Sequence, residues 1–277
     1  MPRTRALVVS LLPALLVLAA LLVLAAPANA RPANPDQPQI ISAVTHQAEP
    51  PNPTSTAEEL ESQGDNLRHQ KLFLDALDYY EVAHDKNPKS AALFNKIGMC
   101  ELQLHWWPKA KKDFERAIKQ DNRYAEAYNN LGVSFYGTKK YSKAINRYQK
   151  AIGLRPQTAS FYSNLGAAYF SEKDFQRSTI AYARALELDP DVFERSSRDG
   201  ISAQMSKPED RARYDYEIAR LYAKMGASDR SLLYLRKAME EGYKGIENVY
   251  KDAEFAGLRK DPRFTELMGA KPPGISE

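Results

Sequence analysis

The sequence predicts an all-α fold, an α-solenoid of helix-turn-helix units that repeat every 34 residues. The first observation behind this prediction is the spacing of four glycines, Gly64, Gly98, Gly132 and Gly166. The second is that small residues follow each glycine after twelve and nineteen positions, and an aromatic residue follows after sixteen. The third is that three of the four units end on a proline, which cannot continue the hydrogen bonding of a helix.

Each recurring position has a packing role in such a unit. The small positions hold Ala76, Ala110, Ala144 and Ser178, and then Ala83, Ala117, Ala151 and Ala185. The aromatic position holds Tyr80, Phe114, Tyr148 and Tyr182. Antiparallel helices approach closely only where side chains are small, and we expect the aromatic ring to fill the wedge between neighbouring units. Apolar residues at the fourth and seventh positions add the stripe of a core-facing helix.

This pattern resembles the tetratricopeptide repeat, which implies a solenoid of such repeats closed by C-terminal capping helices. Thr56 and Glu59 form a capping-box sequence, so the first helix is expected to begin after Thr56. The predicted elements are four repeats at 57–90, 91–124, 125–158 and 159–190, an inserted loop at 191–211, a divergent fifth repeat at 212–245, and capping helices with a tail at 246–277. The last segment resembles a tail that follows the repeats in bacterial members of this family.

The start of the chain has the features of an export signal at residues 1–30. Arg3 and Arg5 precede an apolar stretch at 6–26, and small residues at 28–30 fit a signal peptidase. Cleavage after Ala30 would make the mature protein periplasmic or secreted. The alternative is an uncleaved membrane anchor at 6–26, because a stretch of this length could span a bilayer. Residues 31–56 are rich in proline and are expected to be a disordered linker.

Composition argues against several classes of partner. The chain has 39 Lys and Arg against 35 Asp and Glu. Because Arg3 and Arg5 lie in the predicted signal, the remaining balance is 37 against 35, too nearly neutral to indicate a nucleic-acid partner. The lysines near Lys111 and near Lys140 are expected to form a solvated helix face. Cys100 is the one cysteine, so an internal disulfide is impossible, and we expect it to be a buried core residue.

No catalytic motif is found in the sequence, and we expect a protein without enzymatic activity, cofactor or metal. The four histidines are scattered and show no metal-ligand spacing: His46, His69, His84 and His105. There is no glycine-rich phosphate loop, no Gly-x-Ser-x-Gly motif and no second cysteine for a redox pair. An enzyme of unknown type would need a group of catalytic residues that the sequence does not show.

The family resemblance implies that the first helix of each repeat lines a concave groove for a peptide or a partner protein. The candidate groove residues are Asn95, Lys96, Glu126, Asn129, Asn130, Tyr136, Ser163, Asn164, Phe170, Tyr216 and Arg220. Asn130 and Asn164 match the asparagines with which some family members hold a peptide backbone, since an amide both donates and accepts hydrogen bonds. Tyr136 and Phe170 would then contact the peptide's side chains. An equally open alternative is that these asparagines are ordinary polar surface.

The function predicted from the sequence is a non-catalytic scaffold for protein–protein interaction. The acidic residues Glu61, Asp65 and Glu126 would repel a C-terminal carboxylate, which disfavours the chaperone-tail ligands of other family members. The competing hypothesis is a structural subunit of a cell-envelope complex that binds through its convex face or its capping helices. Trp106, in the turn of the second repeat, could contact a partner or pack back on its own repeat.

Overall fold

The computed structural model describes residues 45–196 and 207–270. The predicted export signal and the first part of the predicted linker lie outside these ranges. Every regular element in the described part is helical. None of the helices in these two ranges is long and apolar enough to cross a membrane.

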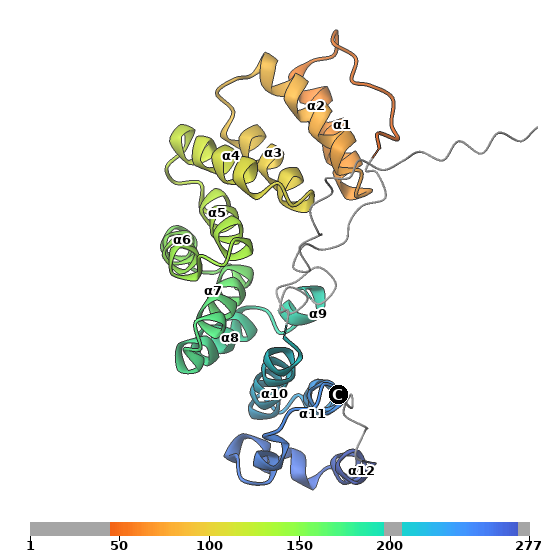
Figure 1. Cartoon of the computed structure of the whole chain (residues 1–277), viewed down its shortest axis with the longest axis vertical. Coiled ribbons are helices and arrows are strands. Elements are labelled where there is room, and N and C mark those ends of the chain that lie inside the picture. Colours follow the sequence, from red (N-terminus) through yellow and green to blue (C-terminus); the bar gives the residue numbers. More distant parts are fainter. Residues whose placement is uncertain (1–44, 197–206, 271–277) are drawn as a thin grey trace, which may run out of the picture. The chain divides into compact units, whose positions relative to one another are not determined.

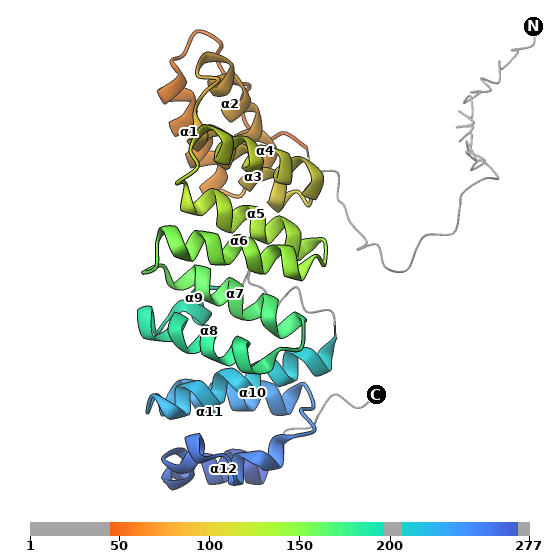
Figure 2. The same ribbon diagram turned by 90° about the vertical axis from the view of Figure 1, so that its left-hand side faces the viewer.

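Eight helices of nearly equal length form the first four units (Figure 1). They are α1 Ala57–His69, α2 Phe73–Lys86, α3 Ala91–Gln103, α4 Trp107–Gln120, α5 Ala125–Gly137, α6 Tyr141–Leu154, α7 Ala159–Ser171 and α8 Phe175–Leu188. The two helices of each unit pack on one another, and the second helix of each unit packs on the first helix of the next (Figure 2). The predicted fold class, an all-α solenoid of two-helix units, is confirmed.

The glycine and aromatic positions meet where the two helices of a unit cross. A Cβ atom added to Gly64 would lie 2.6 Å from Cε1 of Tyr80, and one added to Gly132 would lie 2.5 Å from Cε1 of Tyr148. Both distances are far below van der Waals contact, so only glycine fits at these crossings. The other two units repeat the geometry, with Gly98 against Phe114 and Gly166 against Tyr182. The helix crossings therefore recur with the same 34-residue period as the sequence pattern.

The turns between paired helices also repeat. Each of the four holds a non-glycine residue with a positive φ, namely Lys71 (64°), His105 (58°), Lys139 (58°) and Lys173 (64°). His105 therefore occupies a defined position in its turn. Trp106 follows it, is partly buried against the core that the first and second units share, and has Nζ of Lys109 4.3 Å from its ring centre. Trp106 therefore packs on this shared core, which includes residues of its own repeat, in agreement with one of the two alternatives predicted for it.

The first helix begins as the sequence predicts. Oγ1 of Thr56 accepts a hydrogen bond from the backbone N–H of Glu59 at 3.1 Å. In return, Oε2 of Glu59 accepts one from the N–H of Thr56 at 2.9 Å. This reciprocal capping box satisfies two backbone donors that a helix start leaves without partners.

Residues 45–55 differ from the predicted disordered linker, because they follow α2 and bond to it before ending in a turn at 53–55. Both the N–H of Gln47 and the N–H of Ala48 donate to Oδ1 of Asp75, each at 2.9 Å. Further along, Nζ of Lys86 donates to the carbonyl of Pro53 at 2.7 Å. Prolines favour an extended backbone, but they do not prevent such a segment from packing.

The insertion after the fourth unit is shorter than predicted. A short helix, α9, spans Val192–Ser196, and the first helix of the fifth unit, α10, spans Pro208–Lys224. The boundary expected at 211 is wrong because Pro208 is favoured in the first turn of a helix, where its missing N–H costs nothing. Phe193 of α9 is buried, with its ring centre 5.4 Å from that of Tyr182.

The fifth unit pairs α10 with α11, Ser228–Glu240, and short helices then cover it. These are the 3-10 helices η2 Ile246–Tyr250, η3 Ala253–Ala256 and η4 Leu258–Lys260, followed by α12 Pro262–Ala270. Their buried residues are Val249, Phe255, Leu258, Phe264 and Leu267. A solenoid needs a last element with a polar outer surface, and this segment supplies it.

Candidate functional site

A series of hydrogen-bonded asparagine side chains runs across three units, on the first helices α3, α5 and α7. Nδ2 of Asn164 donates to Oδ1 of Asn129 at 2.9 Å, and Nδ2 of Asn129 donates to Oδ1 of Asn130 at 3.2 Å. Nδ2 of Asn130 donates to Oδ1 of Asn95 at 3.0 Å, and Nδ2 of Asn95 contacts Sδ of Met99 at 3.5 Å. All four carboxamides therefore point their amino groups along one direction of the series.

The series has unused hydrogen-bonding capacity. A carboxamide has two donors and two acceptor lone pairs, and each link of the series uses one of each. Asn130 and Asn164 are partly exposed, whereas Asn95 and Asn129 are buried. The asparagines predicted to grip a backbone are thus held in place by two deeper ones. The sequence signal was available, because Asn95 and Asn130 are 35 residues apart, as are Asn129 and Asn164.

Lys96 belongs to an ion cluster with the first unit. Its Nζ lies 2.7 Å from Oε1 of Glu61 and 2.6 Å from Oδ2 of Asp65. The hydroxyl of Tyr80 donates to Oδ1 of Asp65 at 2.7 Å. Burial opposes ionisation, but the hydrogen bonds from Lys96 and Tyr80 outweigh it and lower the pKa of Asp65. Lys96 is therefore neutralised by its own chain.

The aromatic candidates are buried, which corrects the role expected for them. Tyr136, Phe170 and Tyr216 expose 6%, 1% and 2% of their surface. The hydroxyl of Tyr136 is 2.9 Å from Oγ of Ser171, and burial raises the pKa of Tyr136 to about 12. Phe170 packs edge-on against Tyr214 of the fifth unit, with ring centres 6.2 Å apart. Since these rings fill the spaces between units, they cannot contact the side chains of a peptide.

The remaining candidates fall into separate groups. Glu126 forms an ion pair with Arg155, and Ser163 is partly buried near the asparagine series. Tyr216 donates its hydroxyl to Oδ2 of Asp252 at 2.8 Å, which ties α10 to the C-terminal segment. Arg220 has its closest partner in Oε2 of Glu217, at 2.7 Å, with acids of the C-terminal segment within 4 Å. The structure thus joins the asparagines of the middle units but does not join them to Tyr216 or Arg220.

Two carboxyl side chains of the second unit are buried at positions that the sequence pattern did not single out. Glu101 exposes 4% of its surface and Asp113 exposes 7%. Burial, followed by the repulsion of Asp113, raises the pKa of Glu101 to about 8. No sequence signal distinguished Glu101 from the aromatic residues that occupy the same position in later units, Phe135 and Tyr169.

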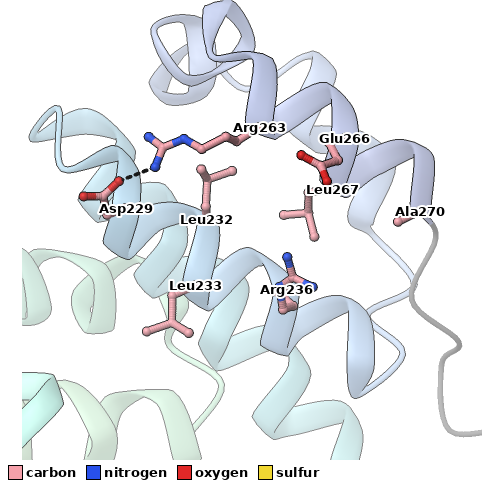
Figure 3. A pocket seen from close by; sticks show the side chains of 8 residues that line it. All are labelled: Asp229, Leu232, Leu233, Arg236, Arg263, Glu266, Leu267 and Ala270. Carbon is pink, nitrogen blue, oxygen red and sulfur yellow. Dashed lines mark hydrogen bonds and ion pairs between the residues drawn. The ribbon is translucent and has the colours of Figure 1, made fainter.

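Two pockets lie on the second-helix side of the last units. One, of about 340 Å³, lies between α11 and α12, with Leu232 and Leu267 facing one another and Arg263 bonded to Asp229 across it (Figure 3). The other, of about 650 Å³, is lined by α7 and α8, including Tyr162, Tyr169 and Ile180. In the described part of the chain, no group of histidine, cysteine and acidic side chains is arranged to hold a metal ion.

Helix pairs stacked in register, with polar side chains bonded from unit to unit, define a solenoid of the kind that serves as a scaffold for protein interaction. Family models agree with this class. A model described as a TPR repeat matches residues 134–172, and models described as tetratricopeptide repeats match 96–145 and 159–192. The chain is a tetratricopeptide-repeat protein. No curated protein matches its sequence significantly.

Several solved structures are similar. A thermophilic TPR protein of Thermus thermophilus is 18% identical, with 77% of this chain and 99% of that chain covered and a TM-score of 0.49. MamA is 23% identical over 68% of this chain and 97% of that one, with a TM-score of 0.45. YrrB, described as a TPR protein with an unusual peptide-binding site, is 16% identical over 78% and 92%, with a TM-score of 0.45.

Proposed function

We propose that this protein holds an extended segment of a partner protein along the first helices of its middle units. The observation that carries the proposal is the asparagine series of α3, α5 and α7. It offers several donors and acceptors that are fixed in position by their neighbours. A peptide backbone presents N–H and C=O groups at a regular spacing along its length, so such a series can bind it without regard to side-chain identity.

The buried rings change the kind of contact that we expect. Because Tyr136 and Phe170 are not available, specificity for the partner must come from other side chains beside the asparagines. Val133 and Met99 are partly buried apolar residues on the same helices, and Ser163 adds a hydroxyl. We propose that the partner's apolar side chains rest on Val133 and Met99 while its backbone bonds to Asn130 and Asn164.

Replacing both Asn130 and Asn164 by alanine should weaken partner binding by roughly five-fold to a hundred-fold. Each neutral hydrogen bond contributes about 0.5 to 1.5 kcal/mol net, and two are removed. The partner is first captured from extracts with the parent protein, and its affinity for parent and variant is then measured by calorimetry.

The matched control replaces Asn66 and Asn122, two exposed asparagines outside the series, by alanine. This control should bind as the parent does, and circular dichroism should show that both double variants remain folded. The proposal that the partner binds along the first helices would be refuted if the Asn130 and Asn164 variant bound as the parent does while changes to second-helix residues abolished binding. The structural-subunit hypothesis would then replace it.

We also propose that the chain is exported and cleaved after Ala30. The mass of the protein recovered from its native host should correspond to a chain that begins at Arg31. A full-length chain in the membrane fraction would instead support anchoring by residues 6–26. The scaffold would in either case meet its partner outside the compartment in which it is made.

A further inference from the structure

The first unit already binds an extended peptide, which is the chain's own segment 46–53. It lies along the second helix α2, where Asp75 accepts the two backbone N–H groups of Gln47 and Ala48. His46 places Nδ1 3.0 Å from Oδ2 of Asp78, and the hydroxyl of Tyr79 donates to the carbonyl of Glu49 at 3.1 Å. The outward surface of a second helix in this fold can therefore hold an extended backbone.

The position of Asp75 carries the opposite charge in the later units. The residues equivalent to Asp75 are Lys109, Lys143, Arg177 and Arg230, and those seven residues further on are Arg116, Lys150, Arg184 and Lys237. Seven residues correspond to about 10 Å along a helix. Every unit after the first thus presents two cations, on the same side of its second helix and about two turns apart. We call these eight residues the cation array.

Most members of the array stand over an aromatic ring. Nζ of Lys143 is 5.9 Å from the ring centre of Phe135, and the guanidinium of Arg177 is 4.6 Å from that of Tyr169. Further members repeat this arrangement: Lys109 over Trp106, Arg116 over Phe94, Lys150 over Tyr128, Arg230 over Tyr222 and Lys237 over Tyr234. An aromatic face attracts a cation and restricts its position, so the charges of the array are held in place.

The charge is least compensated on α6. This helix contains no acidic residue, and Lys143, Arg147 and Lys150 are all exposed on it. None of the three forms an ion pair with any residue in the described ranges. The acids that reach the two ends of α6 are already engaged, since Glu126 pairs with Arg155 and Glu172 accepts from Ser142. The expectation that these lysines are merely solvated does not explain why their helix lacks acids.

A pocket lies beside the array in the fourth unit. Arg177 and Arg184 line it, and Tyr162, Leu165, Tyr169 and Ile180 supply its apolar surface. Ile180 is 63% exposed and lies between the two arginines along α8. The fifth unit repeats this feature, because exposed Leu233 has the equivalent position between Arg230 and Lys237. In the fourth and fifth units the array therefore combines two cations with an exposed apolar residue between them, whereas the equivalent residues of the second and third units are Lys112 and Asn146.

We propose that the cation array binds an extended acidic segment of a partner protein, in which carboxylates alternate with apolar side chains. Carboxylates would pair with Lys143 and Lys150 of the array and with Arg147 beside them on α6, and an apolar side chain would enter the pocket beside Ile180. The array arginines Arg116, Arg177, Arg184 and Arg230 already form ion pairs with acids of this chain. Segment 46–53 shows that an extended chain can lie along a second helix, but the array cations have no acceptor for backbone N–H groups, so they would bind the partner through its carboxylates and carbonyls. A lipid surface fits less well, because a flat bilayer cannot enter a pocket between helices. This site is on the second helices and is independent of the asparagine series.

The test uses a fluorescein-labelled peptide of alternating Glu and Leu, about twelve residues long, and fluorescence anisotropy with the whole protein. The triple variant Lys143→Glu, Arg147→Glu and Lys150→Glu should bind at least about ten-fold more weakly than the parent, since each exposed ion pair contributes a few-fold. Ile180→Ser, a single change at an exposed position, should also weaken binding. The corresponding Gln and Leu peptide should bind poorly to the parent.

The matched control is a second triple variant, with Lys244→Glu, Lys251→Glu and Lys260→Glu. It changes the net charge by the same amount as the first triple variant, at exposed positions outside the array. It should change the affinity by less than about three-fold at physiological salt, where distant charges are screened. The Asn130→Ala and Asn164→Ala variant should bind the acidic peptide as the parent does, which separates this site from the groove. Equal losses in the two triple variants, or no binding at about 1 mM peptide, would overturn the proposal. So would parent binding to phosphatidylglycerol vesicles without binding to the peptide.

Discussion

Gly132→Ala should destabilise the protein by about 1 to 3 kcal/mol or more, although alanine is the better helix former. The added Cβ would lie 2.5 Å from Cε1 and 2.7 Å from Cδ1 of Tyr148, a ring that is fully buried between α5 and α6. Neither the ring nor the helix can move without disturbing the next unit. Urea unfolding followed by circular dichroism measures the change in the free energy of unfolding.

Gly153→Ala is the matched control for this prediction. Gly153 also lies within a helix, α6, but no atom is found within 4 Å of the Cβ that a substitution would add. Alanine there should stabilise the protein by about 0.5 to 1 kcal/mol through helix propensity. If both variants had the same stability, the helix crossing would not be where the structure places it.

The second large effect is a dependence of stability on pH that originates at Glu101. Its pKa is about 8 in the folded protein, because of burial first and of Asp113 second, and lies near 4.5 without these effects. Between these values the folded state binds a proton that the unfolded state has released. The contribution of Glu101 to stability is therefore fully present below about pH 4.5, and it falls as the pH rises towards 8, by up to about 1.4 kcal/mol per pH unit.

Glu101→Gln should remove this fall, because glutamine keeps the shape of the side chain without a titrating group. Urea unfolding at pH 5, 6, 7 and 8 would show a flatter profile for the variant than for the parent. Part of the slope should remain, since burial also raises the pKa of Asp215 to about 7. Exposed Glu58→Gln serves as the control and should keep the parent's profile. An unchanged slope in Glu101→Gln would show that Glu101 is ionised in the folded protein.

Other charges around Glu101 bear on the size of this effect. Lys109 favours the ionised carboxylate, whereas Glu81 adds to the repulsion from Asp113. Arg116 pairs with Asp113 through a contact of 2.7 Å. The prediction made for Glu101 therefore concerns a carboxyl that is buried beside a second carboxyl and has cations nearby.

The sequence predicted the stacked helices well, because one spacing determined both the crossings and the turns. The glycine at each crossing has one compatible partner, the aromatic ring sixteen residues later, so the register had no alternative. The start of α1 was equally determined by Thr56 and Glu59. The start of α10 was not predicted correctly, because the repeat spacing indicated a start at residue 212 whereas Pro208 favours an earlier start.

The candidate site was less predictable because exposed and buried side chains lie on the same helices. Tyr136 and Phe170 lie on first helices, as do the asparagines, but the hydroxyl of Tyr136 bonds to Ser171 of the next unit and the ring of Phe170 packs on Tyr214 of the next unit. A repeat position alone does not reveal which direction a side chain takes. The extended stretch on α2 was missed for a different reason. Its contacts join residues 27 to 33 positions apart and use mostly backbone atoms, which no side-chain pattern records.

Cys100 gives this protein a natural reporter of local opening. It is fully buried among Leu60, Leu93 and Ile97, where α1 and α3 meet, and burial raises the pKa of its thiol to about 12. Thiol reagents attack the thiolate, so the closed molecule is inert to them. Since there is no other cysteine, labelling of the native protein reports openings that expose the core shared by the first two units. The exchange kinetics of one end of the solenoid can thus be followed without altering the chain.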